Sequence, residues 1–454
     1  MKKNVIFKSL ALTFLLATLG CAADKYQSHT LEDELGQYDT SRHSADGEWW
    51  RGYHNNELNN LVETALQKNL DYLRAAININ KELYNLKLQT LNLFPTLAGK
   101  INASSQSEVK RTDNFSSNFS GELGLTYEVD LYGKIRNLQT AQEFEYKATE
   151  QDKESARLSL VNSVVDLYFN LTYLNNAIAL TEKNIALYQN LYNISAQKYQ
   201  SGKTDDIEYL QTRQSLLSEE NKLLNLQTSF KEQESSLRNV LGAKPDEDLN
   251  LEFTELLEQK PLNVNMETPL AVLAKRPDLL ASQYRLEKAF KNLKAEDKNW
   301  YPSISLKGAV NSGSDKARTT FDFPYLLGSV GVDLPFLDWN RVKNNVKISE
   351  ADYNLALIDF KDNLNQALNE VAYYYFAYQK AGQQYDNVKQ NYVNAVKISK
   401  YYQARYNNGK IEFKDYLEAI NTENELCKTL IEQKYQIIKY ENYIFKAMGG
   451  KYGA

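Results

Sequence analysis

Two acidic residues, Asp415 and Glu418, stand close together near the end of the chain, in a segment with helical spacing. Residues three apart lie on the same face of a helix, so the two carboxylates would form one negative site. Such a site attracts cations and repels anions, above all where several copies of it meet at a constriction. The simpler interpretation is a solvated helix face, where charges three apart are usually found.

Residues for catalysis or cofactor binding follow no familiar pattern. All 3 histidines, His29, His43 and His54, lie near the start of the chain. There is no P-loop, no G-x-S-x-G and no H-E-x-x-H motif, and the few cysteines and methionines form no soft-metal site. We therefore predict a protein that is not an enzyme and binds neither cofactor nor metal.

The acidic pair belongs to a sequence that repeats itself at a constant shift of 207 residues. The matching segments include Phe94-Pro95 with Tyr301-Pro302, Lys198-Tyr199 with Arg405-Tyr406, Gly202-Lys203 with Gly409-Lys410, and Leu241-Gly242 with Met448-Gly449. A shift that is constant through every kind of segment indicates a duplicated structural unit. The first-repeat equivalents of Asp415 and Glu418 are Glu208 and Gln211, so the second repeat carries the fuller acidic pair.

Composition and the first residues place the chain among exported proteins. The 53 basic and 58 acidic residues leave a net charge of −5 without a basic stripe, which argues against nucleic acid as a partner. Lys2, Lys3 and Lys8 precede a short apolar run that ends before Gly20-Cys21, the pattern of a secretory signal peptide. Gly20-Cys21 also resembles a bacterial lipobox, which implies acylation of Cys21; ordinary cleavage nearby is the alternative.

The chain divides into six predicted parts. These are a signal peptide (1–20), a lipidated leader (21–55), repeat 1 (56–242), a linker (243–268), repeat 2 (269–449) and a tail (450–454). Apolar spacing in repeat 1 predicts a helix over 57–93, which the proline at 95 ends. Alternating residues predict two strands within about 96–129, joined by a polar loop over 104–117, and their counterparts within about 303–336.

A long helix is expected to follow each pair of strands. Residues 135–199 contain no proline or glycine and carry coiled-coil spacing, and a second helix over 205–241 returns after the turn at Gly202. The fold class is thus mainly α: each repeat is a long coiled-coil hairpin with two strands at its far end. Four strands cannot close a barrel, and open edges are not viable in lipid. Closure needs several copies, and two, three or four would satisfy it.

Several motifs together resemble the outer-membrane efflux protein family, the TolC-like exit ducts of Gram-negative bacteria. The motifs are Trp49-Trp50 with Tyr53, Asn55, Leu58 and Leu61; the junction from Tyr127 to Arg136; its counterpart from Asp333 to Arg341; and Arg405-Tyr406 with Gly409, followed by Asp415 to Ala419. The junction resembles the lipoprotein branch that serves proton-driven tripartite pumps. The resemblance implies a homotrimer with a 12-stranded membrane β-barrel and an α-helical tunnel in the periplasm.

The resemblance also implies roles for the residues singled out above. Asp415 and Glu418, with Glu208 and Gln211, would line a closed periplasmic gate. The two tips would dock a periplasmic adaptor that links the duct to an inner-membrane, proton-driven transporter; their residues are Lys198, Tyr199, Gly202, Lys203, Arg405, Tyr406, Gly409 and Lys410. The alternative for the tips is that the glycines are only helix caps and the tyrosines only core.

The predicted function is passive export of small molecules such as drugs through the outer membrane, where the barrel contacts lipid. One rival is the outer-membrane duct of a type I protein-secretion system, which shares the architecture. A rival from another class is a periplasmic coiled-coil adaptor or scaffold without a pore.

Overall fold

The computed structural model describes residues 30–31, 47–108, 111–203, 205–245, 247–262, 264 and 270–450. The predicted signal peptide, the predicted acylation site Cys21, and the residues His29 and His43 lie outside these residues. The α-helices are α3 (Asn56–Lys68), α4 (Leu70–Leu91), α5 (Lys134–Gln200), α6 (Ile207–Leu241), α7 (Pro277–Asp297), α8 (Trp339–Asn407) and α9 (Phe413–Ala447). The strands are β1 (Thr96–Glu108), β2 (Arg111–Val129), β3 (Ser303–Ser314) and β4 (Tyr325–Asp333).

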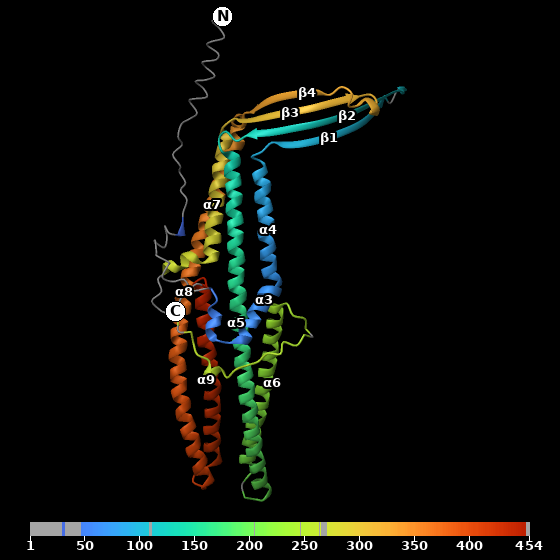
Figure 1. Ribbon diagram of the computed structural model, residues 1–454. Coiled ribbons are helices and arrows are strands. Elements are labelled where there is room, and N and C mark those ends of the chain that lie inside the picture. The colour runs from blue at the N-terminus through green and yellow to red at the C-terminus, as the bar shows by residue number, and fades with distance from the viewer. Residues whose placement is uncertain are drawn as a thin grey trace.

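The molecule is a long helical body with the strands at one end and two helical tips at the other (Figure 1). α5 has 67 residues and α8 has 69, each about 100 Å of helix at 1.5 Å per residue. α4 and α6 accompany the two halves of α5, while α7 and α9 do the same along α8 (Figure 1). The predicted unit of one long helix facing two shorter ones is therefore confirmed.

The four strands form one antiparallel sheet in the order β1-β2-β3-β4. Both hairpins have the same register, because Thr96 faces Thr126 and Ser303 faces Asp333, two pairs that the 207-residue shift relates. β2 pairs with β3 across the two repeats, so the outer edges of the sheet belong to β1 and β4.

The two faces of this sheet differ in polarity. Facing residues in neighbouring strands share a face, and one face carries Leu97, Ile101, Leu123, Leu125, Leu306, Val310, Leu326, Val330 and Val332. The other face carries mainly polar, charged or small residues, among them Lys100, Asn102, Glu122, Thr126, Lys307 and Ser329. One apolar and one polar face are what a barrel strand needs between lipid and a water-filled lumen.

Two expectations about repeat 1 were wrong. The strands run on through most of the expected loop at 104–117, leaving only residues 109–110 between β1 and β2, so the serine-rich segment forms a long hairpin. The helix expected over 57–93 breaks at Asn69, whose backbone is extended (φ −65°, ψ 124°). Its side-chain oxygen accepts hydrogen bonds from the amides of Asp71 and Tyr72, so Asn69 begins a new helix.

The main core lies at the middle of the helical body and includes the described end of the leader, residues 47–55. Trp49 and Trp50, in the 3-10 turn η2 (Trp49–Tyr53), are 8% and 1% exposed, so they pack this part of the leader against the helices. The Trp49 indole donates to the Asn442 side chain at 3.0 Å. Among the described residues, no helix combines the length and apolar character required to span a membrane.

Candidate functional site

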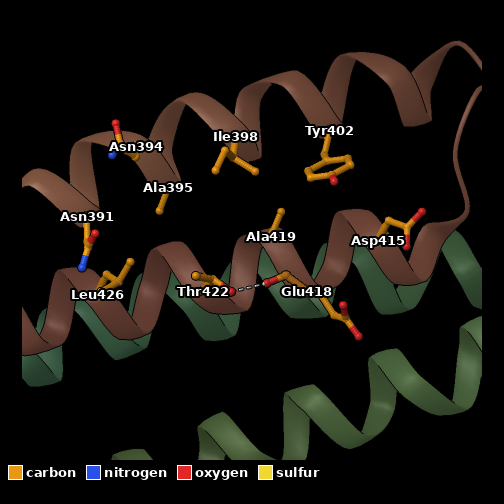
Figure 2. Close-up of a pocket in the computed structure, with 10 residues that line it drawn as sticks. All are labelled: Asn391, Asn394, Ala395, Ile398, Tyr402, Asp415, Glu418, Ala419, Thr422 and Leu426. Carbon is orange, nitrogen blue, oxygen red and sulfur yellow. Dashed lines mark hydrogen bonds between the residues drawn. The ribbon is translucent and has the colours of Figure 1, made fainter.

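Asp415 and Glu418 lie in a groove between α8 and α9 close to the second tip (Figure 2). The groove has a volume of about 490 Å³. Its lining residues are Asn391, Asn394, Ala395, Ile398, Tyr402, Asp415, Glu418, Ala419, Thr422 and Leu426. Both acidic residues are exposed, and across the described chain neither forms an ion pair with a basic residue. Their charge is therefore free to act on ions in solution or on a neighbouring copy.

Their first-repeat equivalents are placed differently. Glu208 is partly buried, and its carboxylate lies 3.6 Å from the Lys198 ammonium group. Gln211 is neutral and partly buried. Because Glu208 is neutralised within the chain, the second repeat carries nearly all of the unpaired negative charge of the four predicted gate residues.

The two tips are joined by Lys198. Its ammonium group donates a hydrogen bond to the Tyr406 hydroxyl and lies 4.7 Å from the centroid of that ring. Burial by itself lowers the pKa of Lys198, but the hydrogen bond from Lys198 to Tyr406 and the charge of Glu208 outweigh it and raise the pKa. A raised pKa means that the link is fully present at neutral pH and is lost only as the pH rises through the raised value.

A second groove of about 540 Å³ lies between the tips. It brings Lys198, Tyr406 and Gly409 together with a tyrosine–phenylalanine cluster in which Tyr406 stacks on Tyr416 at 5.4 Å. Tyr199 lies elsewhere, stacked on Tyr209 at 5.9 Å and 48% exposed. The structure thus places three of the eight predicted docking residues in one groove; adaptor docking itself stays a prediction.

Gly409 and the remaining docking residues lie in or beside the turns. Gly202 and Gly409 have φ of 68° and 65°, in the left-handed region that glycine adopts without a steric cost. Both are surrounded by open space, so backbone conformation alone explains them as helix caps. Lys203 and Lys410 are exposed, and the Arg405 guanidinium donates to the Tyr401 hydroxyl at 3.0 Å.

We expect Lys198→Met to loosen the contact between the tips. The variant keeps the length of the side chain but loses the charge that binds both Tyr406 and Glu208, interactions that contribute about 1 kcal/mol at a partly exposed site. Amide hydrogens at residues 196–203 should then exchange faster in hydrogen-exchange mass spectrometry. Lys203→Met, an equal change in the same turn, is the control and should leave exchange unchanged. Equal protection in both variants would show that Lys198 does not hold the tips.

The structure also reveals a buried acid that no sequence pattern singled out. Glu441 in α9 is 0% exposed and accepts hydrogen bonds from the hydroxyls of Tyr53 (3.4 Å) and Tyr378 (3.1 Å) and from the Leu262 amide (3.1 Å). These donors belong to the leader turn η2, to α8 and to the segment between the repeats. Burial, followed by the charge of Glu441, raises the pKa of Tyr53, so its hydroxyl remains a donor.

The comparisons with known proteins all point to one protein family. The profile of a family described as outer membrane efflux protein matches residues 61–243 and 269–450, one match for each repeat. A protein of Aggregatibacter actinomycetemcomitans named toxin and drug export protein A is 37% identical over 449 residues, 98% of each chain. CusC of Escherichia coli K12, named a cation efflux system protein, is 22% identical over 98% of this chain and 99% of its own.

Solved structures share the fold. A crystal structure of CusC superimposes with a TM-score of 0.83 at 20% identity and covers 94% of this chain and 99% of the other. The outer membrane channel CmeC of Campylobacter jejuni gives a TM-score of 0.82 at 23% identity, over 94% and 93% of the two chains.

Proposed function

We propose that three copies of this chain, which belongs to the outer membrane efflux protein family, pool their sheets into one twelve-stranded barrel and their helices into a periplasmic tunnel. Membership makes the chain an outer-membrane efflux channel of the kind that works in tripartite pumps. The channels of this family are trimers that work with a periplasmic adaptor and an inner-membrane transporter. For this chain the proposal adds a proton-driven transporter and a lipid anchor at Cys21.

The observation that carries the proposal is the four-stranded sheet with its apolar and polar faces and its two open edges. An edge strand in lipid leaves backbone donors and acceptors without partners, so β1 and β4 require partners from other copies. Helix surfaces support the same conclusion, because apolar side chains on α4 and α8 are uncovered in the single chain. They include Leu70, Ile77, Leu88 and Leu91 on α4 and Ile348, Leu355, Ile358 and Phe376 on α8.

We infer that the tunnel conducts small molecules passively and that the acidic residues at the second tip form its periplasmic gate. In three copies, Asp415 and Glu418 would set six carboxylates around one axis. The tip groove that Lys198 and Tyr406 line is the proposed surface for the adaptor.

Membrane fractionation tests this proposal. The protein should be found in the outer-membrane fraction and migrate in unheated detergent gels as a trimer that boiling converts into monomers. A chain that stays in the soluble periplasmic fraction as a monomer would support the alternative of a pore-free adaptor or scaffold.

Export of a protein toxin is a second candidate, because the 37% identical relative is named for toxin as well as drug export. Deleting the gene distinguishes the two. Loss of drug resistance with normal protein secretion supports small-molecule efflux, whereas loss of a secreted protein with unchanged drug resistance supports the secretion duct. A neighbouring gene for a proton-driven pump, as opposed to a secretion ATPase, would point to the first.

A further inference from the structure

We propose that β4 of one copy pairs with β1 of the next in one particular register, which brings Asp333 opposite Lys100 of the neighbouring copy. The inference rests on the proposed function, which supplies the barrel. It adds the alignment of the strands between copies and the charged pair that selects this alignment.

The register follows from the way the two repeats already meet inside one chain. β2 of the first repeat pairs with β3 of the second, and Thr126 faces Lys307. Because both hairpins share one register under the 207-residue shift, the same shift takes Thr126 to Asp333 and Lys307 back to Lys100. If every junction around the barrel is built alike, Asp333 must face Lys100 of the next copy.

This register preserves both faces of the sheet. Asp333 and Lys100 both lie on the polar face, and the adjacent pair, Val332 with Ile101, lies on the apolar face. Val332 and Ile101 are 59% and 79% exposed in the single chain. Pairing would bury the exposed apolar surface of each side chain against the other. A slip of one residue would place apolar side chains of one strand beside polar side chains of the other.

The charges distinguish this register from a slip of two residues, which would also preserve the faces. Such a slip would set Asp333 opposite Ala98 or Asn102 and leave Lys100 facing only Glu122 of its own chain. Within the part of the chain that the structure describes, neither Lys100 nor Asp333 forms an ion pair. Opposite charges that face each other directly stabilise a pair of strands. At the internal junction, the position equivalent to Asp333 is the neutral Thr126. An acid at this position therefore occurs only at the junction between copies.

Cysteine cross-linking tests the register. In a Cys427→Ala background, Ser104→Cys is combined with Ser329→Cys, its proposed partner, or with Leu327→Cys or Gly331→Cys, which lie on the same face two positions away. Facing Cα atoms in an antiparallel pair are about 4.5 to 5.5 Å apart, within the range of a disulfide, and diagonal positions are about 7 to 8 Å apart. Because β1 and β4 are the opposite edges of one sheet, these disulfides can join only different copies.

We expect the Ser104–Ser329 variant to give covalent trimers on non-reducing denaturing gels after oxidation, and the two offset variants to remain largely monomeric. More cross-linking in an offset variant would rule out this register but would still support a barrel formed by several copies. Monomers in unheated gels, with no cross-link in any variant, would overturn the proposed function itself.

A charge reversal provides the second measurement. Lys100→Glu, which also faces Glu122 of its own chain, should lower the temperature at which the trimer dissociates in detergent, and adding Asp333→Lys should restore part of the loss. Lys307→Glu, the same change at the internal junction, should lower this temperature less and should not be rescued by Asp333→Lys. Absence of rescue of Lys100→Glu would contradict the pairing.

Discussion

Replacing Asp415 and Glu418 together with alanine should make the pore leakier and weaken its preference for cations over anions. At the proposed aperture the double substitution removes six carboxylates from a narrow ring. One unit charge acting across about 4 Å contributes about 1 kcal/mol in water and more where water is scarce, so the ratio of cation to anion permeability should fall by about fivefold or more. Single-channel recording in planar bilayers, with a salt gradient to obtain the reversal potential, measures both effects.

Two further variants separate charge from shape. Asp415→Asn with Glu418→Gln keeps the size of both side chains and should lose the cation preference. Asp415→Glu with Glu418→Asp keeps both charges and should retain it. Conductance and selectivity that are unchanged in the alanine and amide variants would contradict a gate at this position and favour a solvated helix face.

Glu441→Leu should destabilise the helical body more than any surface change on the same helix. The substitution leaves the buried Tyr53 hydroxyl and the partly buried Tyr378 hydroxyl and Leu262 amide without this acceptor. A buried donor left in this way costs about 1 to 3 kcal/mol and a partly buried one costs less, so the total loss should be about 2 to 4 kcal/mol. Thermal unfolding followed by circular dichroism of the detergent-solubilised protein measures it.

The control for this variant lies on the same helix. The Glu425 side chain is 54% exposed and pairs with Lys222, so Glu425→Leu should cost less than about 1 kcal/mol. Glu441→Gln, which keeps one acceptor oxygen, should fall between the two. A Glu441→Leu protein that is as stable as Glu425→Leu would show that the buried acid does not hold the leader and the inter-repeat segment to α8 and α9.

The duplicated pattern made most of the architecture predictable. A constant shift fixes equivalent helices, turns and strands, and the structure places Gly202 and Gly409 in the same left-handed turn and both hairpins in the same register. The break at Asn69 was not predictable in the same way, because apolar spacing continues across it and only the capping side chain marks it. The serine-rich strand ends were missed because polar residues without clear alternation are typical of loops.

The candidate site was predictable only in part. Local spacing placed Asp415 and Glu418 on one face of one helix, while their role as a gate was implied by the family resemblance and stays a prediction. Lys198 contacts Tyr406 from the other repeat, a contact between residues far apart in sequence that no local pattern contains. Glu441 was missed because an acid in a helix rich in lysine and tyrosine resembles a surface position until the packing of α8, α9 and the leader is known.

Electron microscopy of the protein purified in detergent shows directly whether three copies form one hollow duct. We predict hollow particles with threefold symmetry, about 140 Å long, the sum of a helical tunnel of about 100 Å and a barrel that crosses the membrane. Slender particles that contain a single chain and have no central channel would contradict a trimeric duct.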